Sequence, residues 1–218
     1  TISLASTPLY SNTTLVPLLA TVGVGGTTIL MTKSDVVKFL EISQRERVTH
    51  AMLVPVQYQR VLAHPDFDRY DLGSYKAKLS TSAPLRAQIK ADCLARWPGR
   101  LIEIYGLTEG AGSCTLEANL NPDKLHTVGK PGLGSEIVVL DEQGRVLPQG
   151  EVGELAGRAS LMMKGYYKQE DKTRELFWYD RDGRLFFKSG DMGKIDEDGF
   201  VVLLDRKKDM IISGGFNV

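Results

Sequence analysis

Residues 105–109 carry three side chains that suit a nucleotide. Tyr105 offers an aromatic face, Thr108 a hydroxyl and Glu109 a carboxylate. An aromatic ring stacks on a purine, a hydroxyl donates to a phosphate oxygen, and a carboxylate is a hard oxygen ligand for magnesium. Because an apolar run, residues 101–104, precedes them, we expect all three at the carboxyl end of a strand, where open α/β sheets bind ligands. Taken alone, the segment also matches an ordinary turn.

Two later segments add a carboxylate and a cation. Asp191 follows Ser189 and Gly190, and an acidic side chain accepts hydrogen bonds from paired ribose hydroxyls. Arg206 lies in a charged run, residues 205–209, and supplies a fixed positive charge. Taken alone, Asp191 is also typical of a solvated turn, and the charged run around Arg206 is typical of a solvent-exposed surface. Together with residues 105–109 they predict a site for an adenosine phosphate.

A third candidate segment consists of Ser82, Ala83 and Pro84. It ends a predicted strand and precedes a predicted helix, so backbone amides and carbonyls lie beside small side chains against which a flat base can lie. A helix N-cap with proline near the first turn explains the same residues.

Composition excludes several functions. Lysine and arginine total 27, as do aspartate and glutamate, so the formal net charge is zero. A chain without net positive charge is not expected to bind nucleic acid. Cys93 and Cys114 have no Cys-x-x-Cys spacing, which predicts neither a disulfide framework nor a zinc site and fits a reducing cytoplasm. No run approaches the roughly 18 apolar residues of a transmembrane segment.

The first half of the chain alternates predicted strands and helices. Leu85, Ile89, Cys93 and Trp97 form one apolar helical stripe, and Ser34 is the predicted N-cap of the second helix. Alternation favours a parallel sheet with covering helices. The predicted strands are 2–5, 28–31, 51–54, 77–80 and 101–104, and the predicted helices are 12–22, 35–47, 56–63 and 85–96.

The second half changes to short strands separated by acidic glycine turns, residues 141–144, 180–183 and 196–199. Such turns join antiparallel strands. The fold class is therefore α/β: a parallel sheet with covering helices followed by a small antiparallel β-barrel subdomain. The predicted domains are 1–127 (the α/β part), 128–207 (the barrel) and 208–218 (a hinge and the start of a further domain).

Other motifs are rejected. The glycines of residues 23–26 lack a following Lys-Ser/Thr and lie after a helix, so they predict a helix end and not a phosphate loop. The acidic turns are not calcium loops, because the twelfth position from Asp196 is Lys207. No Gly-x-Ser-x-Gly is present, and no metal spacing links His50, His64 and His126.

In this order and at these separations, the segments resemble the adenylate-forming superfamily of acyl-CoA synthetases, firefly luciferase and peptide-synthetase adenylation domains. Residues 128–132, 150–155 and 164–167 support the resemblance, and residues 210–218 are most similar to bacterial acyl- and aryl-CoA ligases. The resemblance implies that a fatty or aryl carboxylic acid is activated with ATP and transferred to CoA, releasing AMP and pyrophosphate.

The resemblance also implies residue roles. Ser82, Ala83, Pro84 and Tyr105 line the adenine, Thr108 holds phosphate, Glu109 binds Mg²⁺, Asp191 and Arg206 hold the ribose, Lys208 is a hinge, and Gly214 and Gly215 bind CoA. A phosphate loop is expected before Thr1 and an adenylation lysine after Val218, so the chain is expected to be a fragment with little activity of its own.

Several alternatives stay open. Ser11 stands where many relatives carry histidine. One alternative is an adenylation domain that loads an amino or aryl acid onto a carrier protein. Residues 11–14 offer no aspartate for an amino group, which argues against the loading of an amino acid. A nucleotide-binding protein without chemistry is a third reading. The apolar residues 15–22 either line the acyl pocket or pack in the core. The expected location is cytoplasmic, or peripheral at the membrane for a long-chain acid, and a homo-oligomer is left open.

Overall fold

The computed structural model describes residues 1–206, 212–213 and 216–217, with side chains as far as residue 204. The chain divides into two compact units, which are described separately. The first comprises Thr1–Glu103, Glu117–Leu125 and Ile212–Asn217, and the second comprises Ile104–Leu116 and His126–Ile211. Every helix of the described residues falls short of the length and apolarity that crossing a bilayer requires.

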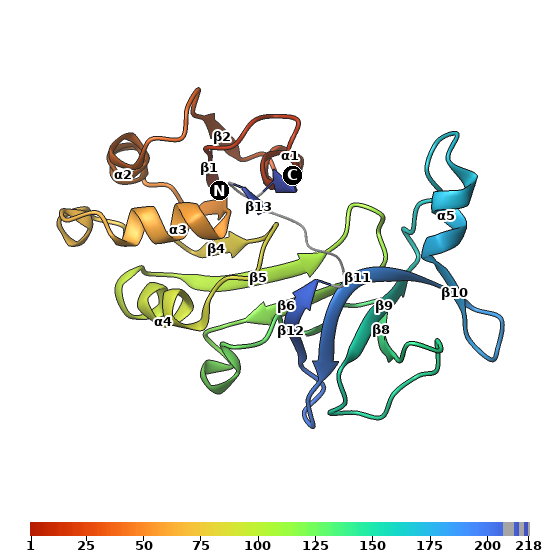
Figure 1. Ribbon diagram of the computed structural model, residues 1–218. Coiled ribbons are helices and arrows are strands. Elements are labelled where there is room, and N and C mark those ends of the chain that lie inside the picture. The colour runs from red at the N-terminus through yellow and green to blue at the C-terminus, as the bar shows by residue number, and fades with distance from the viewer. Residues whose placement is uncertain (207–211, 214–215, 218) are drawn as a thin grey trace. The chain divides into compact units, whose positions relative to one another are not determined.

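Strands and helices alternate through the first unit (Figure 1), and β1 to β5 pair in parallel. The strand order is β2-β1-β3-β4-β5-β6-β7, in which β6 is Ser113–Glu117 and β7 is Lys130–Pro131. The predicted α/β class with a parallel sheet is therefore confirmed. The elements are β1 Ile2–Ala5, α1 Asn12–Gly23, β2 Thr27–Leu30, α2 Val36–Arg45, β3 His50–Leu53, α3 Pro55–Leu62, a 3₁₀ turn Phe67–Arg69, β4 Ala77–Ser80, α4 Ala87–Arg96 and β5 Arg100–Gly106.

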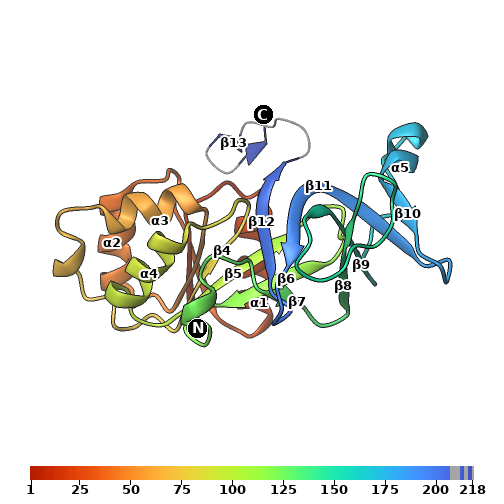
Figure 2. The ribbon, with the colours of Figure 1, turned by 60° about the horizontal axis from the view of Figure 1, so that its bottom comes forward.

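Trp97 is the centre of the core of this unit. Its side chain is 1% exposed and meets Phe39, Phe67 and Tyr75 edge-on, at ring-centroid distances of 6.0, 5.7 and 5.2 Å. Helices α2, α3 and α4, which carry much of this core, lie beside one another in Figure 2. Burial of large aromatic side chains is the main favourable term here, and it fixes β4 and β5, the strands that lead to two predicted site segments.

Helix boundaries correct one prediction and confirm another. The N-cap of α2 is Asp35, whose Oδ1 accepts from the Lys38 amide at 3.0 Å, and not Ser34. Asp35 directly precedes the first helical residue, so its carboxylate reaches the third amide of the helix. Ser34 lies one residue further away, and its hydroxyl accepts from Gln57 Nε2. The glycine cluster does end α1: Gly25 has φ +71°, and the amides of residues 25 and 26 bond back to the carbonyls of residues 22 and 21.

Helix α1 packs its threonines inward. Thr13 and Thr14 are buried, whereas Val16 and Leu19 are 52% and 66% exposed. The side-chain hydroxyl of Thr14 donates to the carbonyl of residue 7, so the buried polar face is satisfied. Within residues 15–22 Thr21 is buried, Leu15, Pro17 and Leu18 are half-buried, and the core cluster of this unit includes none of the apolar side chains of the stretch. Ser11 is the N-cap, its Oγ accepting from the Thr13 amide at 3.3 Å.

The second unit contains a curled antiparallel sheet of order β10-β11-β9-β8, with β12 paired to β11 (Figures 1 and 2). This curled half-barrel confirms the predicted antiparallel subdomain. The elements that follow β5 along the chain are β6 Ser113–Glu117, a 3₁₀ turn Pro122–Lys124, β7 Lys130–Pro131, β8 Ser135–Leu140, β9 Gly153–Ala159, α5 Glu170–Leu176, β10 Phe177–Tyr179, β11 Leu185–Ile195, β12 Val201–Arg206, β13 Ile212–Ser213 and β14 Phe216–Asn217. Of these, the 3₁₀ turn, β13 and β14 belong to the first unit.

The three acidic turns have one hydrogen-bond pattern. The carboxylates of Asp141, Asp180 and Asp196 each accept from the backbone amides two and four residues later, and the glycine at the fourth position has positive φ. Two of the turns add an arginine at the fifth position. These carboxylates therefore stabilise their own turns.

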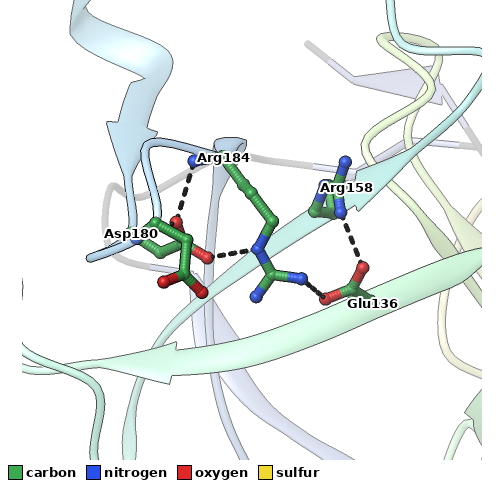
Figure 3. Close-up of polar contacts among 5 residues, drawn as sticks. Glu136, Arg158, Asp180 and Arg184 are labelled. Atoms are coloured by element: carbon green, nitrogen blue, oxygen red, sulfur yellow. Dashed lines mark hydrogen bonds and ion pairs between the residues drawn. The ribbon is translucent and has the colours of Figure 1, made fainter.

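One of these turns joins a surface network (Figure 3). The Arg184 guanidinium donates to Asp180 at 2.7 Å and to Glu136 at 3.0 Å, and Arg158 donates to the same Glu136 at 2.7 Å. All four side chains are partly exposed, so solvent screens each pair and the network adds little to the stability of the fold. The network ties β8, β9 and the β10–β11 turn and involves none of the predicted site residues.

Candidate nucleotide site

Tyr105 and Asp191 meet in the second unit. The Tyr105 hydroxyl, at the end of β5, donates to Asp191 Oδ2 on β11 at 2.8 Å. Asp191 is only 6% exposed, and it follows Gly190, whose φ is +73° inside the strand. The pairing register shifts here, and such bulges re-aim side chains beside functional sites. The alternative of a solvated turn aspartate is therefore wrong.

A short chain of hydrogen bonds fixes the Asp191 backbone. Its amide donates to Ser189 Oγ at 3.0 Å, and that hydroxyl donates to the carbonyl of Leu155 at 2.8 Å. Burial, together with the neighbouring Asp191 charge, raises the pKa of Tyr105 well above its usual value. Tyr105 is thus a neutral donor that holds one oxygen of the carboxylate and presents an aromatic ring beside it.

Arg206 lies opposite Asp191 in the β11–β12 pairing. Its side chain is outside the described part of the chain, as are Lys208, Gly214 and Gly215. The register alone brings the backbones of Asp191 and Arg206 side by side on neighbouring strands. The predicted ribose, hinge and CoA roles of these four residues remain predictions.

Thr108 and Glu109 lie in a turn directly after β5, closed by the bond from the Gly110 amide to the Leu107 carbonyl at 3.0 Å. Thr108 is exposed and Glu109 half-buried. Glu109 Oε1 accepts from the hydroxyl of Tyr166 at 2.6 Å. Tyr166 was not a predicted site residue, because 57 residues separate the partners and no local pattern links them.

The segment Ser82, Ala83, Pro84 follows β4 in the first unit. Ser82 has φ +75°, an uncommon conformation for a residue with a side chain, and such strain gathers at functional segments. Its hydroxyl lies 3.3 Å from Thr13 Oγ1. Helix α4 begins at Ala87 with Arg86 as its N-cap, so the alternative of a capped helix start at residues 82–84 does not hold.

A buried ion pair between Lys90 and Glu103 holds the residue that follows this segment, Leu85. Glu103 Oε1 accepts from the Leu85 amide at 2.6 Å, Oε2 pairs with Lys90 Nζ, and both side chains are 2% exposed. Burial raises the pKa of Glu103 and lowers that of Lys90, and each charge opposes the shift of the other. Side chains alternate along a strand, so Glu103 lies on the same buried face of β5 as Leu101. This alternation could have identified Glu103 from the sequence as a buried carboxylate.

No group of three or more His, Cys, Asp or Glu in the described residues is arranged to hold a metal ion. Glu109 is a single half-buried carboxylate. This donor set fits Mg²⁺, which is commonly bound through one or two protein carboxylates together with substrate phosphates and water. It does not fit a structural metal centre enclosed by protein.

A parallel sheet with covering helices and a curled antiparallel sheet define a protein of the adenylate-forming fold. The model of the family described as "AMP-binding enzyme" matches residues 1–167, and the chain belongs to this family.

Three similar proteins illustrate the range of the family. The medium/long-chain-fatty-acid–CoA ligase FadD8 of Mycobacterium tuberculosis is 35% identical over 89% of this chain and 34% of its own length. Feruloyl-CoA synthase of an Amycolatopsis species is 35% identical over 99% of this chain and 43% of its own. The solved structure of the amide bond synthetase McbA from Marinactinospora thermotolerans aligns with a TM-score of 0.87 at 32% identity, over 99% of this chain and 43% of that one. The chain thus spans about two fifths or less of the length of these proteins.

Proposed function

We propose that the full-length protein is an AMP-forming acyl-CoA ligase acting on a fatty or aryl carboxylic acid. The observation that carries the proposal is the bond between Tyr105 and Asp191, which joins an aromatic face to a buried carboxylate at a strand bulge. An aromatic ring stacks on the base of a nucleotide, and a carboxylate accepts hydrogen bonds from its ribose hydroxyls. The fatty-acid and feruloyl ligases among the similar proteins support this substrate class.

Each predicted residue has a role in this proposal. Asp191, aided by Arg206, accepts from the ribose hydroxyls, and Tyr105 with Ser82, Ala83 and Pro84 borders the adenine. Thr108 donates to phosphate, Glu109 holds Mg²⁺, Lys208 is the hinge, and Gly214 with Gly215 borders CoA. Mg²⁺ bound there with ATP neutralises phosphate charge.

The reaction needs positioning more than a protein nucleophile. A carboxylate oxygen of the acid attacks the α-phosphorus of ATP, and pyrophosphate leaves with the electrons of the broken P–O bond. The CoA thiolate then attacks the acyl carbon, and AMP leaves. In-line alignment and charge neutralisation lower both barriers. In this proposal Thr108 and Glu109 position the phosphates and their Mg²⁺, and Asp191 positions the ribose.

The test is a substrate panel with the full-length protein, ATP, Mg²⁺ and CoA, in which AMP and pyrophosphate are measured by chromatography. We expect AMP release with at least one fatty or aryl acid, together with the matching acyl-CoA. ATP binding without AMP release for every acid in the panel would contradict the proposal.

A second candidate is transfer of the acyl group to an amine, which the similarity to an amide bond synthetase favours. It shares the adenylation step and differs only in the acceptor. Replacing CoA with a panel of amines separates the two, since an amide product with no acyl-CoA would select this candidate.

A further inference from the structure

The hydrogen bond from Tyr166 to Glu109 does not follow from any role assigned above. The phenol oxygen lies 2.6 Å from Glu109 Oε1, a short distance typical of a bond to a charged acceptor. The phenol hydroxyl is the donor of this bond, because an ionised carboxylate can only accept.

Tyr166 is itself held in place. Its backbone amide donates to Thr173 Oγ1 at 2.9 Å, and that hydroxyl donates to the carbonyl of Gln169 at 2.9 Å. Thr173 is 8% exposed, so water competes little for these bonds. Tyr166 therefore reaches Glu109 from a backbone that is fixed on α5.

A second contact fixes the Glu109 backbone to the same loop. The amide of Met163 donates to the Glu109 carbonyl at 2.9 Å. Next along the chain, a Cβ on Gly110 would lie 2.4 Å from the carbonyl oxygen of Leu161, so only glycine permits this approach. The loop thus holds both the main chain and the side chain of Glu109.

The bond leaves the other carboxylate oxygen available. Within the described residues, no hydrogen bond or ion pair engages Glu109 Oε2. A carboxylate that binds a metal through one oxygen is oriented by a hydrogen bond to the other, and loss of such a partner typically weakens metal binding about 10- to 100-fold. With a single protein carboxylate at the site, few other protein groups would compensate.

We propose that Tyr166 is a positioning residue that orients Glu109 so that its free oxygen binds the Mg²⁺ accompanying ATP. This inference rests on the proposed function, because it assumes that Glu109 is the metal-binding carboxylate. Tyr166 touches no reacting atom; it acts through Glu109.

The test compares Tyr166→Phe with the wild type in the full-length protein. Tyr167→Phe is the matched control, because it removes the same hydroxyl from the neighbouring residue, which is 84% exposed. Mn²⁺ binding in the presence of ATP is measured by electron paramagnetic resonance, and pyrophosphate exchange is measured against free Mg²⁺. We expect the Mn²⁺ dissociation constant of Tyr166→Phe to rise about 10- to 100-fold. The exchange rate should recover at high Mg²⁺, and Tyr167→Phe should match the wild type.

A dissociation constant for Tyr166→Phe within twofold of wild type, or a lower one, would overturn the inference. If Tyr166→Phe does not fold, Thr173→Val takes its place: weaker Mn²⁺ binding supports the positioning role, and unchanged binding overturns it. A wild-type protein that binds ATP without any dependence on metal would instead contradict the magnesium role in the proposed function, and would remove the inference with it.

Discussion

Replacing Glu103 by glutamine tests whether charge or hydrogen bonding holds the segment before α4. In Glu103→Gln the amide oxygen still accepts from the Leu85 amide, but the Lys90 ammonium loses its counter-charge where the side chain is 2% exposed. Solvent screening is small at such burial. Removal of one partner from a buried pair costs about 3–5 kcal/mol, a large part of the roughly 5–15 kcal/mol that stabilises a typical domain.

The assay is differential scanning calorimetry of the full-length protein, in which the Tm of the variant is compared with that of the wild type. At about 2–4 °C per kcal/mol for a domain of 150–250 residues, the expected fall in Tm is about 6 to 20 °C. The matched control is Lys90→Met with Glu103→Gln, which removes both charges and keeps the bond to Leu85. Because no unpaired charge remains buried, we expect this double variant to recover most of the lost stability.

Two results would refute the reasoning. A single variant that melts within about 1 °C of the wild type would mean that the pair is hydrated in solution. A double variant that melts as low as the single one would place the loss elsewhere, for example in the bond that Lys90 donates to the Leu125 carbonyl at 2.9 Å.

Three further outcomes are expected. Asp191→Asn should raise the KM for ATP about 10- to 100-fold in steady-state kinetics, because a hydrogen bond to a charged group contributes about 1.5–3 kcal/mol. An unchanged KM would mean that Asp191 does not bind the ribose. Gly110→Ala should lower the free energy of unfolding by more than Gly183→Ala, since both glycines have similar positive φ (+72° and +74°) but only the Cβ at Gly110 would meet a carbonyl oxygen at 2.4 Å; equal losses in urea titrations would contradict this. Cys93 and Cys114 should resist alkylation in the native protein and react after denaturation, because both thiols are buried and burial raises the pKa of each to about 12. Alkylation of either residue in the native protein, detected by peptide mass spectrometry, would contradict this expectation.

Local patterns were sufficient for the elements and the fold class. The predicted strands 2–5 and 77–80 coincide with β1 and β4, and the glycine after α1 ends that helix as expected. These features depend on alternation, capping and positive φ, which involve only neighbouring residues. The choice of Asp35 over Ser34 as N-cap was missed, because both types cap helices and position alone separates them.

The partners of the candidate site were decided by tertiary structure. The sequence nominated Tyr105 and Asp191 separately for one nucleotide, but their hydrogen bond joins positions 86 residues apart. Tyr166 reaches Glu109 across 57 residues, and Lys90 reaches Glu103 through the packing of α4 on β5. A side chain's type fixes which bonds it can make, whereas strand order, bulges and burial fix which partner it meets and how strongly the two interact.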